Sequence, residues 1–270
     1  MSYKELIIKN HQVMSFNKVF ATIKQGQDLF WPGCAILSLG NEIAQKTYSF
    51  MKDINQNLSY STFCCGKPSM HIYNGKDFEK RINFIEKSLV ENGTKNIYTL
   101  CPNCVVTLSE NISINVQSAW SIINENFPKE KYNMLEGKTF SLHDPCPVVK
   151  DIEATVHIRS ILNKMGVEVL EFENNREKTI CCGKKNMIMT LEPEKGKKLF
   201  ELRATQAPSK DIVTYCASCV ETFKHNSYNA YHILELMFNS IDNEDEFKSS
   251  SSWLNRYKNV NDFKRSDDNA

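Results

Sequence analysis

Ten cysteines are the residues of this chain most able to do chemistry, and they fall into two sets of five. Thiolates are soft metal ligands and redox groups. Equivalent members of the two sets are separated by 112, 117, 117, 115 and 115 residues. Matched spacing in two halves predicts two matched sites rather than ten unrelated core cysteines. The sets are Cys34, Cys64, Cys65, Cys101 and Cys104, and Cys146, Cys181, Cys182, Cys216 and Cys219.

The residues around the cysteines repeat as well. The segment TFCCGKPSM at 62–70 reappears as TICCGKKNM at 179–187. Likewise, CPNCVVTL at 101–108 reappears as CASCVETF at 216–223. The chain is therefore an internal duplication of one cysteine-rich module.

Composition narrows the classes of protein that the chain can belong to. Its 270 residues carry 33 basic and 32 acidic side chains in a mixed pattern, which does not indicate nucleic acid or a membrane surface as a partner. The N-terminal residues lack the apolar core of a signal peptide, and no run of about 18 apolar residues predicts a membrane span. We therefore expect a cytoplasmic protein. In the reducing cytoplasm, cysteines act as metal ligands or catalysts more often than they form disulfides.

Short apolar runs alternate with helical patterns in both halves. Runs at 30–31, 97–100, 139–142, 167–170 and 211–215 are typical of strands, whereas 78–89 and 193–206 have helical spacing. This alternation predicts an α/β fold of two duplicated, Rossmann-like cysteine-rich modules with parallel sheets, related by pseudo-two-fold symmetry. Ligands gather beyond the carboxyl ends of such strands, which is where the cysteines occur.

Polar segments suggest where the modules end. The polar stretch 127–137 predicts a link between an N-terminal module, residues 1–135, and a C-terminal module, residues 136–240. Residues 241–270 are rich in charge and serine, which predicts a mobile tail with a possible anchor at Trp253.

Five thiols at one site are more than common metal sites need. Structural zinc and an ordinary iron–sulfur cubane each use four ligands. Adjacent cysteines in an extended segment point to opposite faces, so both reach one centre only if the centre is large and the backbone bends sharply. Gly66 and Gly183, directly after each cysteine pair, permit that bend and a close approach to sulfide.

The spacing and the Cys-Cys-Gly motifs resemble the cysteine-rich CCG domain. That domain occurs in the cysteine-rich subunit of heterodisulfide reductase and in related subunits of lactate, glycolate and glycerol-3-phosphate oxidoreductases. The resemblance covers roughly residues 30–240, and both motifs are complete, which favours the heterodisulfide-reductase-like branch.

The resemblance implies that each set holds a noncubane [4Fe-4S] cluster, at which a disulfide is cleaved in two one-electron steps. The chain would then be an oxidoreductase subunit acting on a sulfur group. An alternative is an electron-relay subunit of a flavin- or quinone-linked dehydrogenase with no substrate site of its own. A third possibility is that one of the two sites holds structural zinc.

Several other residues have both a functional and a structural interpretation. Lys67 and Lys184 follow the motif glycines, and their charges would offset a negative cluster; solvated lysines are the alternative. His143 lies in a His-Asp-Pro-Cys segment that resembles the family's, so it could donate a proton to a leaving thiolate or simply hold the turn. Trp31 and Tyr215 abut ligands, where they could shield a cluster or pack in the core.

The two sets use every cysteine in the chain. No ferredoxin-type cysteine run and no Gly-x-Gly-x-x-Gly motif remains for a second cluster or a dinucleotide. Electrons must therefore come from another protein. We expect a ferredoxin-like partner, similar to the ferredoxin-like subunit of heterodisulfide reductase, a flavoprotein donor, or both.

Overall fold

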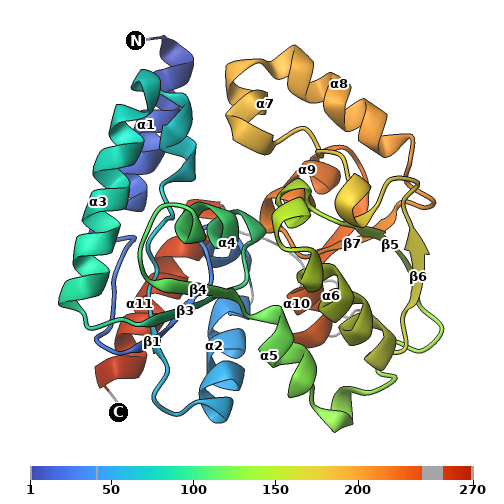
Figure 1. Ribbon diagram of the computed structural model, residues 1–270. Coiled ribbons are helices and arrows are strands. Elements are labelled where there is room, and N and C mark those ends of the chain that lie inside the picture. Colours follow the sequence, from blue (N-terminus) through green and yellow to red (C-terminus); the bar gives the residue numbers. More distant parts are fainter. Residues whose placement is uncertain (1, 41, 239–251, 269–270) are drawn as a thin grey trace. The chain divides into compact units, whose positions relative to one another are not determined.

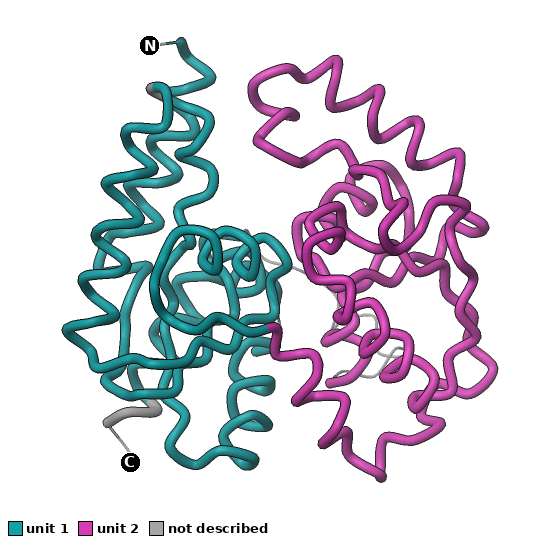
Figure 2. Tube along the Cα trace, in the orientation of Figure 1, with its two compact units in different colours: residues 1–117, 240–270 teal, residues 118–239 magenta. Residues whose placement is uncertain are grey.

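Two four-stranded sheets, one in each half of the sequence, form the framework of the chain. The structure, a computed structural model, describes residues 2–40, 42–238 and 252–268. These belong to two compact units, unit 1 with residues 1–117 and 240–270, and unit 2 with residues 118–239 (Figure 2). Every strand pair whose register is described is parallel. The predicted duplicated α/β fold is confirmed.

Unit 1 has the strand order β2-β1-β3-β4 (Figure 1). Its first helix begins with a capping box, in which Ser2 and Glu5 satisfy each other's backbone N–H groups. The elements of unit 1 are helices α1 (Tyr3–Ser15), α2 (Ile43–Ile54), α3 (Lys76–Glu91), α4 (Pro102–Ser109) and α11 (Ser252–Asp268), 3-10 helices η1 (Ile36–Ser38), η2 (Lys67–His71) and η3 (Tyr73–Gly75), and strands β1 (Asp28–Trp31), β2 (Ser59–Tyr60), β3 (Asn96–Thr99) and β4 (Asn115–Ser118).

Unit 2 has the equivalent order β6-β5-β7-β8. Its elements are helices α5 (Trp120–Glu125), α6 (Ile152–Lys164), α7 (Ile188–Leu191), α8 (Pro193–Ala204), α9 (Ala217–His225) and α10 (Ile233–Phe238), 3-10 helices η4 (Lys129–Lys131), η5 (Cys146–Lys150), η6 (Arg176–Lys178) and η7 (Lys185–Met187), and strands β5 (Thr139–His143), β6 (Glu168–Glu171), β7 (Asp211–Thr214) and β8 (Asn229–His232).

The apolar pattern of α3 shows why these segments fold where the sequence predicts. Phe78, Ile82, Ile85 and Leu89 are buried in the core of unit 1, as their helical spacing indicates. The helix ends at Glu91, and its C-cap Asn92 precedes Gly93, which has a positive φ. In unit 2, α8 takes the same place between β6 and β7, so the helix predicted at 193–206 is confirmed.

The C-terminal segment differs from the expectation. Residues 241–251 of the predicted tail lie outside the described residues, but 252–268 form helix α11, which packs on unit 1 and is not a free tail. Asn255 and Asn259 donate side-chain hydrogen bonds to the carbonyl oxygens of Ser38 and Leu37. The anchor expected at Trp253 is present, since its ring contacts Phe20 at 5.0 Å between centroids. Buried amide contacts explain why a polar sequence forms an ordered helix here.

The division between the units also lies earlier than composition indicated, at residues 117 and 118 rather than 135 and 136. Helix α5 packs on α6, where Lys164 donates hydrogen bonds to the backbone and side chain of Asn124. Residues of the polar link pair with unit 2 as well, because the Leu135 amide donates to the carbonyl oxygen of Met165. Among the described residues, no helix is long and apolar enough to cross a membrane.

Candidate metal centres

The first cysteine set assembles at the carboxyl ends of three strands of unit 1. Cys34 follows β1, the adjacent pair follows β2, and the Cys-x-x-Cys motif follows β3 and begins α4. The Sγ atoms of Cys34 and Cys64 are 3.5 Å apart. Thiol contacts continue through the set in the order Cys34, Cys64, Cys65, Cys104, Cys101. Five sulfurs from three segments therefore form one group.

The second set repeats this arrangement in unit 2. The Sγ atoms of Cys182 and Cys219 are 3.2 Å apart. Contacts run through the set in the equivalent order, Cys146, Cys181, Cys182, Cys219, Cys216. All ten cysteines are free thiols. The order of thiol contacts is the same in both halves, as expected for two equivalent sites.

Each set has three buried and two partly exposed cysteines. In the first set three cysteines are buried, whereas Cys34 and Cys101 are partly exposed. In the second set three are again buried, whereas Cys146 and Cys181 are partly exposed. Each set therefore combines a buried side with a side that solvent can reach.

The thiols differ in how readily they ionise. Contacts with neighbouring thiols hold the pKa of Cys64 well below its ordinary value, and the same cause lowers the pKa of its counterpart Cys181. Cys181 also accepts hydrogen bonds from the backbone amides of Gly183, at 3.2 Å, and Lys185, at 3.3 Å. Contacts and burial raise the pKa of Cys104 and Cys219. The first cysteine of each adjacent pair is thus the most readily formed thiolate, the ligand form of the residue.

A buried arginine accompanies each set, and the sequence indicated neither. Arg256 of α11 is 2% exposed and donates hydrogen bonds to Ser15, and its charge favours the thiolates of Cys34 and Cys64. Arg203 of α8 is fully buried. Burial lowers its pKa to about 10, and the nearby thiols of Cys219 and Cys182 act against that fall. Buried cations of this kind offset the charge of a thiolate-rich site. Their distance from the motifs left no local signal in the sequence.

The two motif lysines lie beside the helices that carry the Cys-x-x-Cys motifs. Lys67 Nζ donates to Asn103 Oδ1 at 2.8 Å, and Lys184 forms an ion pair with Glu221. The charge of Lys184 also helps to lower the pKa of Cys216 to about 7, after the larger effects of contacts with Cys219. The lysines therefore hold equivalent places in the two units.

Gly66 and Gly183 have φ angles of +77° and +89°, which confirms the sharp bend expected after each pair. A Cβ on Gly183 would meet the carbonyl oxygen of Gly196 at 2.4 Å, and one on Gly66 would meet the Arg81 side chain at 3.2 Å. Gly33 is the glycine whose Cβ would crowd a cysteine, lying 2.7 Å from the Cβ of Cys101.

His143 is buried against the second set. One nitrogen of its ring and the sulfur atoms of Cys182 and Cys219 could each bind a metal, and these three atoms lie within 4.8 Å of one another. Arg203 Nε donates to His143 Nδ1 at 2.9 Å. Burial, followed by the charge of Arg203, holds the pKa of His143 well below its ordinary value. The ring is therefore a neutral, enclosed group rather than part of the turn's surface.

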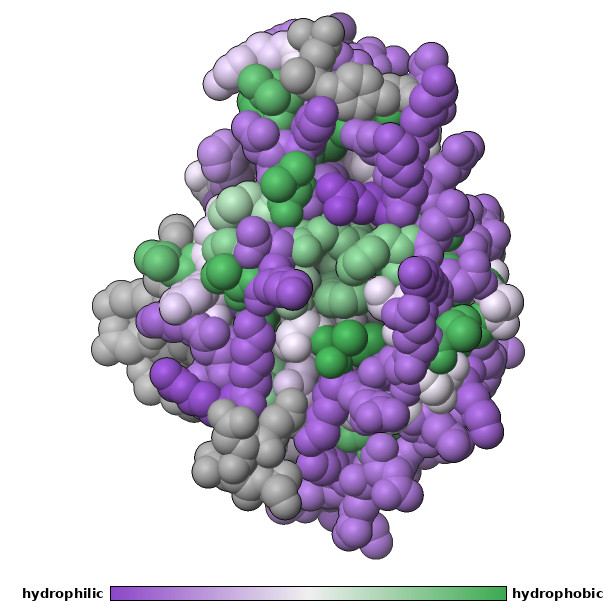
Figure 3. All heavy atoms as spheres, turned by 90° about the vertical axis from the view of Figure 1, so that its left-hand side faces the viewer, coloured by the Kyte–Doolittle hydropathy of each residue, from purple (hydrophilic) through white to green (hydrophobic). Residues whose placement is uncertain are grey.

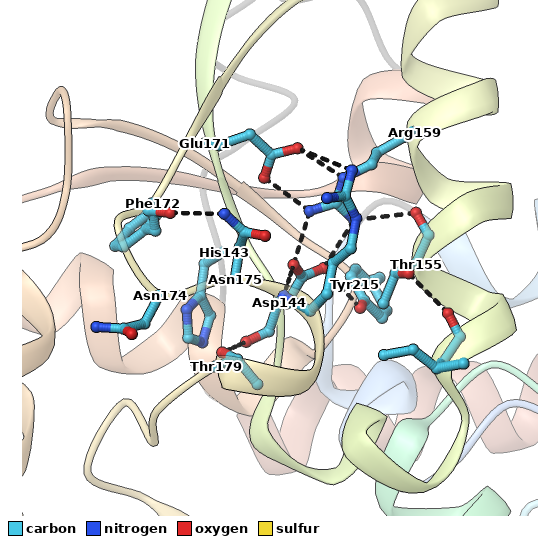
Figure 4. Close-up of polar contacts among 12 residues, drawn as sticks. His143, Asp144, Thr155, Arg159, Glu171, Phe172, Asn174, Asn175, Thr179 and Tyr215 are labelled. Carbon is cyan, nitrogen blue, oxygen red and sulfur yellow. Dashed lines mark hydrogen bonds and ion pairs between the residues drawn. The ribbon is translucent and has the colours of Figure 1, made fainter.

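Asp144, the next residue, connects the three segments that carry the second set (Figure 4). Its carboxylate accepts hydrogen bonds from the Tyr215 hydroxyl at 2.9 Å and from Arg159 at 2.7 Å. Its carbonyl oxygen accepts one from Thr179 Oγ1 at 2.5 Å. Tyr215 directly precedes Cys216, and Thr179 lies two residues before Cys181. The carboxylate and the backbone carbonyl oxygen of Asp144 thus join all three segments.

A pocket of about 330 Å³ lies beside the first set, between α1 and α3. Gln12 separates this pocket from the cysteines, because its Nε2 lies 3.8 Å from the Sγ of Cys64. Figure 3 shows apolar side chains at the surface on the side of the molecule that it draws. Val13 and Phe84, which line the pocket, are 51% and 47% exposed. The pocket is lined by Lys9, Gln12, Val13, Ser69, Ile72, Asp77, Lys80, Arg81 and Phe84.

Fold and sites together define a duplicated α/β protein with two equivalent five-cysteine centres. The sequence profile of the cysteine-rich domain family, CCG, matches the chain twice, at residues 29–109 and 140–224. These matches cover more than half of the chain, and the chain belongs to this family. CCG domains are typical of iron–sulfur redox proteins, so the sites are suited to metal or iron–sulfur binding and to electron transfer.

Other comparisons add little. No curated protein matches the chain. Among solved structures, an aspartate racemase homologue from Pyrococcus horikoshii OT3 is 14% identical, with 88% of this chain and 99% of that chain covered and a TM-score of 0.29. A glutamate racemase from Bacillus anthracis is 10% identical, with 78% and 77% covered and a TM-score of 0.35. Likeness at this level carries no argument about structure or activity.

Proposed function

We propose that this chain is the iron–sulfur subunit of a heterodisulfide-reductase-like complex, in which each five-cysteine set holds a noncubane [4Fe-4S] cluster. The observation that carries the proposal is the order of thiol contacts, which is the same in both sets and includes all five cysteines. Zinc uses four ligands, so five converging thiols fit a larger centre better. The buried arginines and the depressed pKa values of Cys64 and Cys181 suit a centre that binds thiolates.

The proposed reaction is the reduction of a disulfide. One S–S bond breaks, two electrons and two protons are taken up, and two thiols are released. When bound, the clusters supply single electrons and iron that can coordinate sulfur. Two sites in one chain match a reaction that needs two electrons. The electrons come from a ferredoxin-like subunit, a flavoprotein, or both, because the ten cysteines leave no ligands for a further cluster.

The chain's own residues hold the centres and control what reaches them. Three buried cysteines in each set exclude water from one side. The partly exposed cysteines mark the side from which a disulfide would approach; they are Cys34 and Cys101 in one set and Cys146 and Cys181 in the other. Lys67 and Lys184 add positive charge beside α4 and α9, which favours an anionic leaving sulfur. The protons that complete the thiols come from solvent on this open side.

An electron-relay subunit of a flavin- or quinone-linked dehydrogenase is the second candidate. The burial of Cys64, Cys65 and Cys104, and of Cys182, Cys216 and Cys219, supports it, because enclosed clusters exchange electrons without binding substrate. The two candidates differ in what reoxidises the reduced protein. A disulfide substrate needs access to the cluster, whereas a relay needs only proximity to a carrier.

Anaerobic purification with iron and acid-labile sulfide counts tests the cofactor. We expect about eight irons and eight sulfides per chain, as two [4Fe-4S] clusters require. About four irons with one zinc would mean that one site is structural. A folded chain without metal would refute the proposal.

Stopped-flow reoxidation then separates the two functions. The protein is reduced by a low-potential donor and mixed with a panel of small disulfides and a panel of quinones. Reoxidation by a disulfide, with a thiol-induced change in the spectrum of one cluster, supports the reductase. Rapid reoxidation by quinones alone, with no thiol effect, would assign the chain to the relay class.

A further inference from the structure

Trp31 and His143 occupy the same position in the two modules. Each lies three residues before the first cysteine of its set. Trp31 is the last residue of β1 and pairs with Thr99 in β3, whereas His143 is the last residue of β5 and pairs with Thr214 in β7. Thr99 and Thr214 in turn each lie two residues before the Cys-x-x-Cys motif. Sequence spacing and sheet register therefore agree that the two residues are equivalent.

Both side chains bury a ring nitrogen that has no partner. Trp31 and His143 are each 0% exposed. Within the part of the chain that the structure describes, Trp31 Nε1 and His143 Nε2 have no hydrogen-bond partner. An unsatisfied buried N–H is unfavourable, and native proteins rarely keep one without a reason. Its occurrence at the same position in two modules of different sequence points to a missing acceptor that both sites share.

The residues packed around the two rings point to sulfur as that acceptor. His143 lies against Cys182 and Cys219. Trp31 belongs to the same buried cluster as Cys65 and Cys104, which are the counterparts of those two cysteines. A cluster held by these ligands brings sulfide and thiolate acceptors to this place. N–H donors to cluster sulfurs are known determinants of reduction potential.

Arg203 determines which nitrogen of His143 carries the proton. A guanidinium has five donors and no acceptor, so the bond from Arg203 Nε requires a lone pair on His143 Nδ1. The neutral ring then carries its hydrogen on Nε2, which makes Nε2 a donor and prevents it from ligating a metal. Arg203 is itself held in place by the carbonyl oxygen of Asn174, at 2.6 Å, and by the face of Phe172. Trp31 needs no such partner, because an indole nitrogen is always a donor.

We propose that Trp31 and His143 are matched hydrogen-bond donors to the sulfurs of the two clusters, and that Arg203 is the positioning residue that keeps His143 in the donating tautomer. The inference rests on the cluster binding proposed above but not on disulfide reduction. Removing either donor makes the reduced, more negative cluster less stable. The reduction potential of that site falls, whereas the potential of the other site is unchanged.

Trp31→Phe tests the first site with little change in side-chain volume. In the full chain loaded with clusters, spectroelectrochemical titration is expected to show about a tenfold fall in the ratio of reduced to oxidised first-site cluster at a fixed potential. Trp120→Phe, at a fully buried tryptophan of unit 2, controls for the lost ring volume and leaves this ratio within about twofold. An unchanged ratio in Trp31→Phe overturns the proposal for the first site.

Two double variants test the second site with the buried charge removed in both. The variant His143→Phe with Arg203→Met has no ring N–H donor. We expect the ratio of reduced to oxidised second-site cluster to fall about tenfold in it. His143→Trp with Arg203→Met installs the indole of the first site and restores the ratio to within about twofold of the parent. Equal potentials in the two double variants would show that the donor is irrelevant.

A second readout does not depend on reduction. Pulsed EPR of each loaded protein in H₂O and D₂O reports exchangeable hydrogens near the cluster, and one such coupling is expected to disappear in Trp31→Phe. Persistence of every coupling would contradict the proposal even if the potentials shift. A chain that binds no iron and sulfide at all would refute the proposed function before this measurement, so the two failures are distinguishable.

Discussion

Tyr215 and Asp144 lie 71 residues apart in the sequence and are joined by a hydrogen bond of 2.9 Å between the Tyr215 hydroxyl and Asp144 Oδ1. The bond links the segment that carries Cys216 to the segment that carries Cys146. Burial, with the adjacent carboxylate as a further cause, raises the pKa of Tyr215, so the hydroxyl remains a donor at neutral pH. The second cysteine set is therefore assembled by polar contacts as well as by the sheet.

We expect Asp144→Asn to destabilise unit 2 and to empty the second site. The substitution removes the charge that pairs with Arg159 and weakens the bond from the Tyr215 hydroxyl beside Cys216, a loss of about 2–4 kcal/mol. Chemical unfolding and iron counts measure the two effects. Glu171→Gln is the matched control, because Glu171 also pairs with Arg159 but holds no cysteine-bearing segment. Equal iron loss in both variants would contradict the role of Asp144.

Single ligand substitutions should act only within their own set. Cys182→Ser is expected to remove or convert the second cluster and to leave the first, because described thiol contacts do not pass between the sets. Cys65→Ser should do the reverse. EPR and iron analysis would show about half of the parent's intact clusters in each variant. Loss of both signals in a folded single variant would disprove separate sites.

Gly183→Ala should destabilise unit 2 by more than the positive φ angle of residue 183 alone explains. The new Cβ would lie 2.4 Å from the carbonyl oxygen of Gly196, which is backbone and cannot move aside. We expect more than about 3 kcal/mol of destabilisation, with loss of the second cluster. Gly137→Ala has a similar positive φ but open space around its Cβ, so it should show only the strain of about 1–2 kcal/mol. Similar unfolding midpoints for the two variants would argue against the clash.

Arg256→Gln should weaken the first site from a position far along the chain. The substitution removes the buried charge that favours the thiolates of Cys34 and Cys64. A chelator competition is expected to release iron from the first site about tenfold faster, with the second site unaffected. Arg265→Gln on the surface of the same helix serves as the control. Unchanged release in Arg256→Gln would limit α11 to a packing role.

His232 predicts a dependence of unit 2 stability on pH. Burial lowers its pKa from 6.5 to about 3, so the folded chain keeps the ring neutral while the unfolded chain takes up a proton. Stability contributed by His232 is therefore complete above about pH 6.5 and is lost as pH falls towards 3, by up to about 1.4 kcal/mol per pH unit. Burial raises the pKa of Glu235, which acts in the opposite direction.

Unfolding of the metal-free chain between pH 4 and 7 measures this slope. His232→Asn keeps an acceptor for the Leu234 amide and is expected to flatten the slope. His225→Asn at the exposed end of α9 should leave it unchanged. A slope that is the same in all three proteins would assign the acid sensitivity to other groups.

The sequence alone determined the two cysteine sets, the duplication and the strand-helix alternation. These depend on local patterns: cysteine motifs of fixed spacing, and apolar residues such as Ile82 and Ile85 at helical intervals. The α/β class and the location of the cysteines at strand ends followed from the same patterns. The positive φ of Gly66 and Gly183 was also predictable, because only glycine adopts it without strain.

Tertiary structure decided which distant residues serve each site. Arg203 and Arg256 have no motif around them, and their charges reach the cysteines only because α8 and α11 pack there. The equivalence of Trp31 and His143 is readable as a spacing, but their unpartnered nitrogens appear only when the strands pair and bury them. Long-range contacts of this kind depend on the whole packed core, whereas a ligand motif is contained in a few neighbouring residues.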